Sequence, residues 1–249
     1  MRTMYVVLRN FLMGANLISF SLLLKPRKMV QYIAETLFLY KIFSGRGIEQ
    51  KNVYEVLGSN DHEPIELINL KSNTWFYNGS FLADIISLCL ICRITKPKIV
   101  FEIGTFKGYT ALHFAVNTPD DTKIYTLDLP EGVEPELKTT CVDRENIKKH
   151  KRDFQNNKIE RLFGDSATFD YSPFYGKVDF FFIDGSHSYE YVKSDTLNAL
   201  KCCHPGSVIA WHDFGRSGVN RVSKWLLEFS KKNKIYSIPA GSLAFMIVD

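Results

Sequence analysis

The sequence predicts an α/β protein with a doubly wound sheet of seven strands, the last one antiparallel, and an N-terminal helical extension. From residue 98 onward, apolar runs such as Ile99–Phe101 and Phe180–Ile183 alternate with helical segments. This alternation is typical of parallel strands that helices cover on both faces. The last two apolar runs, Lys234–Pro239 and Leu243–Val248, are separated by one short turn. Strands joined in that way can only pair antiparallel.

The elements follow in order along the chain. The expected strands are Lys98–Ile103, Lys123–Leu129, Ile159–Phe163, Val178–Ile183, Ser207–Trp211, Lys234–Pro239 and Leu243–Val248, and the expected helices are Phe81–Ile94, Tyr109–Val116, Asp143–Phe154, Tyr189–Lys201 and Asn220–Lys231. Between residues 44 and 78 the apolar pattern weakens around several Gly and Pro residues, which indicates an irregular connector. We therefore expect a helical extension with its connector over residues 1–77 and one catalytic domain over residues 78–249.

Composition limits the classes of protein that fit. The chain has 249 residues, of which 45% are hydrophobic, enough for one sizeable core. Its net charge of +4 gives no indication of nucleic-acid binding. Cys89 and Cys92 form a C-x-x-C on an apolar helix face, which favours core thiols over a redox or metal pair. A reducing compartment and a cytoplasmic location follow as expectations.

The N-terminal segment is apolar and basic. Residues 4–24 are rich in Leu, Val, Ile and Phe, but Arg9, Asn10 and Asn16 interrupt them. A membrane-spanning helix needs about 20 mostly apolar residues, so spanning is the weaker alternative. We expect residues 1–45 to pack on the domain, on a partner subunit of a homo-oligomer, or on an anionic membrane surface as a peripheral contact.

The first strand of the predicted sheet leads into a glycine-rich turn, Glu102-Ile-Gly-Thr-Phe-Lys-Gly108. Gly104 permits a tight turn, and Gly108 permits close approach to the backbone. An acidic side chain beside such a turn suits a ligand with hydroxyl and ammonium groups. The turn therefore predicts a nucleoside site.

Acidic residues also follow the next two predicted strands, at the sheet edge where such folds bind ligands. Asp128 comes about 20 residues after Gly108, where a carboxylate can accept both hydroxyls of a ribose. Gly164-Asp165-Ser166 can reach a purine edge. The alternatives stay open: Glu102 and Asp128 could cap helices, and Gly-Asp-Ser is common turn chemistry.

Two further acidic residues indicate a cation. Asp184 and Asp213 both follow very apolar strands, and carboxylates brought together near a core repel one another unless a cation lies between them. His212 is either a third ligand or a core histidine. His187, three residues after Asp184, would overhang the same site, and an imidazole is the usual general base. The alternative for His187 is a helix cap or a surface side chain.

These residues together resemble a class I S-adenosylmethionine-dependent methyltransferase with a Rossmann-like fold. The pattern from Glu102 to Thr110 is similar to that of the catechol O-methyltransferase group. Asp184-x-x-His187 and His212-Asp213 resemble more closely the metal-dependent sugar O-methyltransferases. The resemblance covers about residues 78–249.

The resemblance implies roles for the motif residues. Glu102, Gly104, Thr105, Gly108, Tyr109 and Thr110 would surround the methionine half of S-adenosylmethionine, Asp128 and Leu129 its ribose, Asp165 and Ser166 its adenine, and Asp184 would lie beside both cofactor and metal. Asp184 and Asp213 would bind Mg²⁺, with His212 where the family more often has an acidic residue. That departure leaves Mn²⁺, Zn²⁺ or a site of two carboxylates open. His187 would be the base, where the catechol group has a lysine.

We therefore expect a metal-assisted O-methyltransferase that acts on a hydroxyl of a sugar, glycan or other diol-containing small molecule. The alternatives are a catechol- or phenol-type O-methyltransferase, a nicotinamide-dependent oxidoreductase, or a non-catalytic module that associates with membranes. The oxidoreductase would need Gly-x-Gly-x-x-Gly after its first strand, which this turn lacks.

Overall fold

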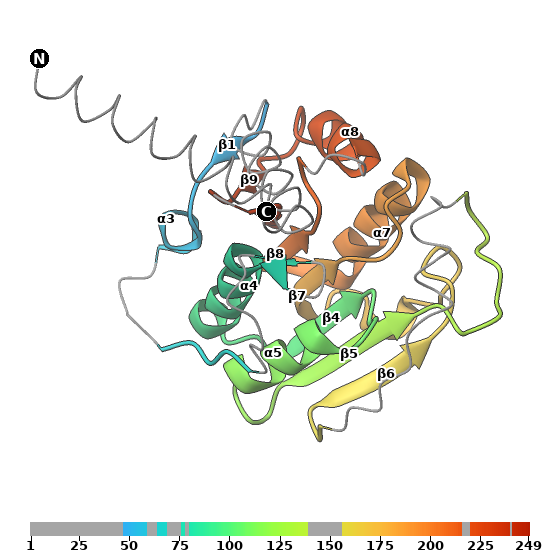
Figure 1. Ribbon diagram of the computed structural model, residues 1–249, viewed down its shortest axis with the longest axis horizontal. Coiled ribbons are helices and arrows are strands. Elements are labelled where there is room, and N and C mark those ends of the chain that lie inside the picture. The colour runs from blue at the N-terminus through green and yellow to red at the C-terminus, as the bar shows by residue number, and fades with distance from the viewer. Residues whose placement is uncertain are drawn as a thin grey trace, which may run out of the picture. The chain divides into compact units, whose positions relative to one another are not determined.

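A computed structural model describes residues 47–58, 64–68, 76–77, 80–138, 156–215, 220–239 and 241–249 (Figure 1). All of them belong to one unit, Ile42–Asp249. The helical extension predicted over residues 1–45 and the helix predicted over residues 143–154 lie outside the described residues. Within the described ranges, none of the helices combines the length and the apolar character that crossing a membrane requires.

The main sheet has eight strands, in the order β1-β9-β10-β8-β7-β4-β5-β6 (Figure 1). Their bounds are β1 Glu49–Gln50, β4 Ile99–Ile103, β5 Lys123–Asp128, β6 Ile159–Phe163, β7 Val178–Ile183, β8 Cys203–Trp211, β9 Tyr236–Ser237 and β10 Ala244–Ile247. Strands β6, β5, β4, β7 and β8 pair in parallel. β10 is antiparallel to both β8 and β9. The α/β class, the parallel central sheet and the reversed last strand are as predicted.

The prediction of seven strands was wrong by one. β1 pairs in parallel with β9, with Glu49 opposite Tyr236 and Gln50 opposite Ser237. The connector expected between residues 44 and 78 also contains helix α3 (Val53–Leu57) and strand β2 (Phe76–Tyr77), which pairs with β3 (Ser80–Phe81). Strands of two residues are too short to show an alternating pattern, so the sequence could not reveal them.

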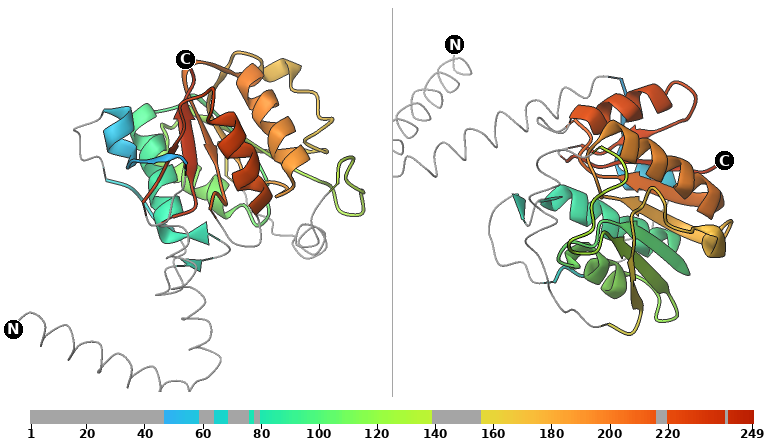
Figure 2. Two further views of the ribbon diagram at one scale, coloured as in Figure 1. Left: turned by 90° about the horizontal axis from the view of Figure 1, so that it is seen from above. Right: turned by 90° about the vertical axis from the view of Figure 1, so that its right-hand side faces the viewer.

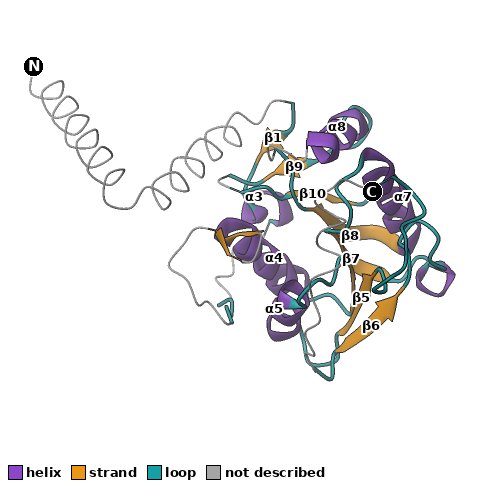
Figure 3. Ribbon diagram, turned by 45° about the vertical axis from the view of Figure 1, so that its right-hand side comes forward, coloured by secondary structure: helices purple, strands orange, loops and turns teal. Residues whose placement is uncertain are grey.

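Helices cover both faces of the sheet. On one face lie α3, α4 (Leu82–Thr95) and α5 (Tyr109–Asn117), and on the other lie α7 (Tyr189–Cys202) and α8 (Asn220–Phe229) (Figures 2 and 3). A short 3₁₀ helix, η1, spans Ser172–Phe174. The predicted helices that correspond to α4, α5, α7 and α8 are confirmed to within two residues at each end.

Each face of the sheet has its own apolar core. Phe180 and Phe182 of β7 pack toward the α4 and α5 side with Phe114 and Ile91. The intervening residues, Phe181 and Ile183, pack toward the α7 and α8 side with Trp211 and Trp225. Burial on both faces explains the continuous apolar run Phe180–Ile183 in β7. Cys89 and Cys92 are free and fully buried, as the interpretation as core thiols predicts.

The sheet order creates a switch point at β4. From β4 the chain adds β5 and β6 in one direction, and it then returns to add β7 and β8 on the other side of β4. The helices after β4 and β7 leave opposite faces of the sheet (Figure 3). A doubly wound sheet binds its ligands at this point, outside the carboxyl ends of its strands.

Candidate active site

The turn after β4 is held tightly against its neighbours. Gly104 has a φ of 102°, and a Cβ atom on it would lie 2.1 Å from the carbonyl oxygen of Asp184. The glycine is therefore required so that the ends of β4 and β7 can approach each other. Gly108 also adopts a left-handed conformation, with a φ of 68°, and immediately precedes α5. Phe106, between these glycines, has a φ of 47°, which is uncommon for a residue other than glycine.

Glu102 lies inside the sheet edge and does not cap the following helix. Its side chain is 1% exposed, and Oε2 accepts a hydrogen bond of 2.5 Å from the hydroxyl of Thr126 in the neighbouring strand β5. The hydroxyls of Thr126 and Thr105 lie 2.7 Å apart, which extends the chain into the turn. Burial raises the pKa of Glu102 well above its usual value; the Thr126 hydrogen bond opposes that rise, and the carboxylates of Asp184 and Asp128 add to it.

Asp128, at the end of β5, is bonded to the same turn. Oδ2 accepts from the backbone N–H of Phe106 at 3.0 Å, and Oδ1 accepts from that of Leu129 at 3.0 Å. Burial raises the pKa of Asp128, while both backbone hydrogen bonds and Arg161 oppose the rise. The structure thus brings the predicted ribose residue against the glycine-rich turn.

Asp165 after β6 is engaged within the protein. Oδ1 accepts from the backbone N–H of Ala167 at 2.8 Å, an Asx turn, and Oδ2 accepts from the backbone N–H of Glu136 and from the hydroxyl of Tyr191. Its carboxylate therefore organises the turn and the loop around Glu136. The adjacent Ser166 is 9% exposed. Asp165 therefore has the turn-forming role that the sequence left open as an alternative. Its contact with the adenine stays a prediction.

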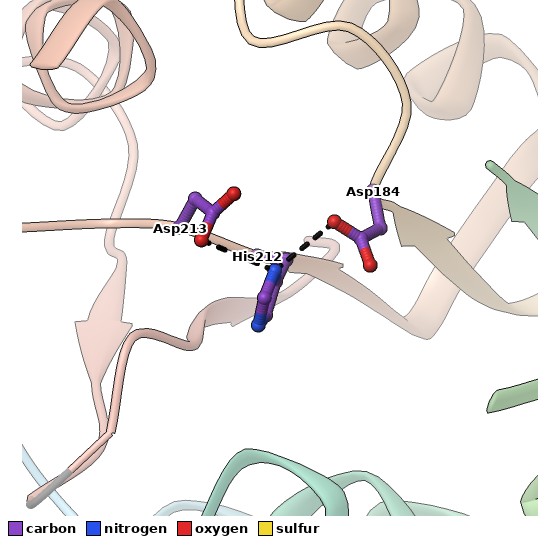
Figure 4. Close-up of side chains that lie close together, drawn as sticks. All are labelled: Asp184, His212 and Asp213. Carbon is purple, nitrogen blue, oxygen red and sulfur yellow. Dashed lines mark ion pairs between the residues drawn. The ribbon is translucent and has the colours of Figure 1, made fainter. Parts of the chain in front are cut away.

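Asp184, His212 and Asp213 converge at the ends of β7 and β8. Each offers one donor atom, and these atoms lie within 4.8 Å of one another. Nδ1 of His212 is 3.0 Å from Oδ1 of Asp184 and 3.4 Å from Oδ1 of Asp213. Figure 4 shows the two carboxylates on either side of the imidazole. Adjacent ligands at about 2.1 Å from one ion lie about 3 Å apart, so these separations suit a shared cation.

The backbone supports this arrangement at Asp213. Its φ of 63° is left-handed, a conformation that costs a residue other than glycine on the order of 1 kcal/mol or more. Such strain is common where a side chain must be aimed at a functional site. Burial alone would raise the pKa of Asp213, but His212 and His187 outweigh it and hold that pKa well below its usual value.

The charge of His212 responds to the same carboxylates. Burial alone would lower its pKa, but Asp184 and Asp213 outweigh burial and raise it well above the usual value. Even so, Nδ1 makes no aligned hydrogen bond with any residue in the described part of the chain. A buried imidazole nitrogen that lies between two carboxylates has the donor chemistry that a divalent cation requires. The residues present therefore fit a metal ion.

His187 lies beside this cluster, just before α7. Its Nε2 is 2.6 Å from Oδ2 of Asp213, the oxygen other than the one that faces His212. Ser188, not His187, caps the helix, because its hydroxyl accepts from the backbone N–H of Tyr191. The helix-cap alternative for His187 is therefore wrong, and the predicted base is in contact with a predicted metal ligand.

Sequence reasoning missed two residues that contact the predicted site residues. Asp84 of α4 contacts Nε2 of His212 at 3.2 Å, and Thr126 holds Glu102. Asp84 did leave a signal, because it is an isolated acidic residue in the apolar run Phe81–Ile94. Thr126 left none, because threonine is ordinary in a strand.

Comparison with known proteins identifies the domain. A family described as "Methyltransferase domain" matches residues 101–214. A protein of Dictyostelium discoideum named "Probable caffeoyl-CoA O-methyltransferase 3" is 26% identical over 212 residues, 75% of each chain. This match decides against the nicotinamide-dependent oxidoreductase.

Solved structures also resemble the chain. An O-methyltransferase from Bacillus cereus in complex with S-adenosylhomocysteine is 18% identical, with a TM-score of 0.47, covering 67% of this chain and 81% of that one. The O-methyltransferase TomG from Streptomyces achromogenes, solved with S-adenosylmethionine, is 16% identical, with a TM-score of 0.47, covering 86% and 96%. The family match over residues 101–214 includes the glycine-rich turn and the acidic cluster, and the chain carries a methyltransferase domain there.

Proposed function

We propose that the enzyme transfers a methyl group from S-adenosylmethionine to a hydroxyl oxygen of a sugar or another acceptor with a vicinal diol, assisted by a divalent cation. The observation that carries this proposal is the donor set of Asp184, His212 and Asp213 directly beside His187. An alkyl hydroxyl ionises reluctantly, so its methylation benefits from both a cation and a base.

The methyl donor belongs at the ends of β4, β5 and β6. In this proposal Glu102, Gly104, Thr105, Gly108, Tyr109 and Thr110 surround its methionine half. Asp128 and Leu129 face its ribose, and Asp165 and Ser166 its adenine. The bond from Phe106 N–H to Asp128 supports the ribose role, because it holds that carboxylate against the turn.

The cation belongs between Asp184, His212 and Asp213. When bound, it would lower the pKa of the acceptor hydroxyl, and S-adenosylmethionine would supply an electrophilic methyl group. Asp184 comes directly after β7, and its backbone carbonyl lies against Gly104 in the glycine-rich turn. The acceptor hydroxyl and the methyl donor would therefore be held side by side, and this alignment is the main contribution that a protein makes to such a transfer.

His187 is the proposed proton acceptor. A carboxylate only accepts hydrogen bonds, so Nε2 of His187 donates to Oδ2 of Asp213, and Nδ1 is the ring atom that takes a proton. Asp213 thereby orients the ring and stabilises the imidazolium that forms. The proton would pass from the acceptor hydroxyl to His187 as the oxygen bonds to the methyl group, and the bond between that methyl group and the sulfonium sulfur would break to leave S-adenosylhomocysteine.

A phenolic acceptor is the second candidate. It is favoured by the similarity to the Dictyostelium discoideum protein, whose name states a caffeoyl-CoA acceptor. A phenol ionises more readily than a sugar hydroxyl and depends less on a strong base. His187 stands where the sugar O-methyltransferases that the sequence resembles have their base, so we place sugar diols first.

Methyl transfer to a panel of acceptors tests the proposal. The full-length protein is incubated with labelled S-adenosylmethionine and vicinal-diol sugars, catechol or caffeoyl-CoA, and the products are identified by mass spectrometry. We expect EDTA to abolish transfer and added Mn²⁺ or Mg²⁺ to restore it. Asp184→Asn should lose activity, whereas Asp179→Asn, a carboxylate at the opposite end of β7, should keep it.

In the same assay His187→Gln should lower turnover by about 10²–10⁴-fold, the usual effect of removing a general base. Full activity in chelator would remove the cation from the mechanism. Methylation of catechol or caffeoyl-CoA, with the sugars left unmodified, would replace the first acceptor class by the second.

A further inference from the structure

Asp84 is a buried carboxylate whose position is fixed by the turn before β10. It lies in the first turn of α4 and is 0% exposed. Oδ1 accepts from the backbone N–H of Ser242 at 2.7 Å and from that of Leu243 at 3.0 Å, and Oδ2 accepts from the Ser242 hydroxyl at 2.8 Å. A Cβ atom on Gly241 would lie 2.3 Å from Oδ1 of Asp84, so the close approach of this turn to the carboxylate requires glycine at position 241.

The same carboxylate contacts the far side of His212. Oδ2 of Asp84 lies 3.2 Å from Nε2, while Nδ1 faces Asp184 and Asp213. The Ser242 hydroxyl, which donates to Asp84, also lies 3.4 Å from Nε2 of His212. Both neighbours of Nε2 therefore act as acceptors toward the ring, and Nε2 carries the hydrogen. In the neutral ring the lone pair then lies on Nδ1. The buried acid therefore selects the tautomer that presents a nitrogen donor to the proposed cation.

We propose that Asp84 is a positioning residue that holds His212 Nδ1 as a metal ligand and gives the site a preference for Mn²⁺ and similar transition-metal ions over Mg²⁺. This inference rests on the proposed function, because it requires a cation between Asp184, His212 and Asp213. Imidazole nitrogen suits transition-metal ions, whereas Mg²⁺ favours oxygen donors and retained water. A carboxylate behind a ligating histidine fixes its ring and raises its basicity.

Asp84→Asn is the variant that changes the tautomer of His212 with the least change in shape. Its amide oxygen can still accept from Ser242 and Leu243, but its NH₂ group would face Nε2 of His212. The ring would then favour the opposite tautomer, with hydrogen on Nδ1, which cannot bind a metal ion. The shape of the site is kept while its donor is lost.

Asp179 provides a matched control at the opposite end of the sheet. Its Oδ2 accepts from the backbone N–H groups of Lys98 and Ile99, and its Oδ1 lies 3.1 Å from Nε2 of His204. Asp179→Asn thus makes the same chemical change to a carboxylate bonded to two backbone N–H groups and one histidine.

Metal binding to the full-length protein tests the inference without measuring turnover. Chelator-treated wild type, Asp84→Asn and Asp179→Asn are titrated with MnCl₂ and with MgCl₂ by calorimetry in the presence of S-adenosylhomocysteine. We expect wild type to bind Mn²⁺ at least about tenfold more tightly than Mg²⁺, and Asp84→Asn to lose about 10–100-fold in Mn²⁺ affinity, the usual effect of removing such a partner. Asp179→Asn should match wild type.

Pulsed electron paramagnetic resonance of Mn²⁺ bound to the wild type adds a readout that needs no variant. We expect coupling to a directly bound nitrogen. Thermal unfolding and S-adenosylhomocysteine affinity show whether Asp84→Asn is folded. If it is not folded, the inference is tested on the wild type alone, by the nitrogen coupling and by the ratio of its Mn²⁺ and Mg²⁺ affinities.

The outcomes separate the two proposals. Absence of any metal binding by wild type overturns both the cation of the proposed function and this inference. Metal binding without nitrogen coupling or without a preference for Mn²⁺, or with unchanged affinity in a folded Asp84→Asn variant, overturns the inference and leaves the proposed function standing.

Discussion

One carboxyl group, that of Asp195 in α7, is buried in a setting unlike that of its neighbour Asp165. Asp195 is 0% exposed, and neither of its oxygens has a hydrogen-bond partner of ordinary geometry among the residues that the structure describes. Burial raises its pKa to about 7; the nearby Ser166 hydroxyl lowers it in part, and Asp165 raises it. Asp165, by contrast, has hydrogen-bond donors on both oxygens. At the scale of a single residue, burial is thus the main influence on the pKa of Asp195.

The raised pKa of Asp195 predicts a pH dependence of stability. In the unfolded chain Asp195 ionises near pH 3.9, whereas in the folded protein it ionises near pH 7. Between these values the folded state binds the additional proton, so the free energy of unfolding falls as pH rises from about 4 to about 7, by on the order of 4 kcal/mol, and is flat above. Asp195→Asn cannot ionise and should lack this loss. Melting temperatures across that range should favour the variant increasingly as pH rises.

Asp165→Asn is the control for this prediction. It removes an acceptor from a carboxylate that has donors, so we expect it to be less stable than wild type at neutral pH. An Asp195→Asn variant with the same pH slope as wild type would show that Asp195 is already ionised in the folded protein.

At the scale of elements, the joint between β4 and β7 determines where the site forms. The backbone N–H of Asp184 donates to the carbonyl of Ile103 at 2.8 Å, and that of Gly104 donates to Leu127 of β5 at 2.9 Å. The peptide group between Ile103 and Gly104 therefore ties three strands together. A side chain at position 104 has no space here, because the carbonyl of Asp184 occupies it.

Gly104→Ala should break this joint. Its methyl group would have to displace the backbone of Asp184, so we expect a loss in the free energy of unfolding of about 4 kcal/mol or more. Gly132→Ala is matched in conformation, with a φ of 82°, but nothing lies within 4 Å of its Cβ. That control should lose only about 1–2 kcal/mol, the backbone cost of a left-handed residue. Urea unfolding of both variants measures the difference, and equal losses would contradict the steric account.

At the scale of the whole molecule, the switch point divides the candidate site into two halves. Glu102 and Asp128 lie on β4 and β5, on one side of the joint, while His212 and Asp213 follow β8 on the other. Asp184 directly follows β7, between the two halves, and its backbone contacts Gly104. The methyl donor and the cation would thus depend on separate parts of the sheet that meet at one edge.

This division predicts separable binding defects. Asp128→Ala removes the carboxylate proposed for the ribose, so the dissociation constant for S-adenosylhomocysteine should rise at least about tenfold, the loss of one charge-assisted hydrogen bond or more. Its Mn²⁺ affinity should stay at the wild-type value. Asp213→Asn should show the reverse pattern. Calorimetry with each ligand checks both, and an unchanged cofactor affinity in Asp128→Ala would mean that the ribose lies elsewhere.

The local pattern of the chain was enough to predict most of the fold. Apolar runs and the helices between them predicted the central strands β4 to β8 and the helices α4, α5, α7 and α8, because each element buries a face and burial leaves a periodic trace in sequence. β1 was missed because two residues carry no period, and its pairing with β9 depends on a partner far along the chain.

The sequence by itself also determined which edge of the sheet carries the polar residues, since the acidic groups follow the strands and parallel strands end at the same edge. Only the tertiary structure decided their partners: Thr126 for Glu102, Phe106 for Asp128, and Asp84 behind His212. A hydrogen bond between distant elements requires one donor and one acceptor at the right separation. It imposes no repeating pattern on either segment, so it appears only when the folded chain brings the two together.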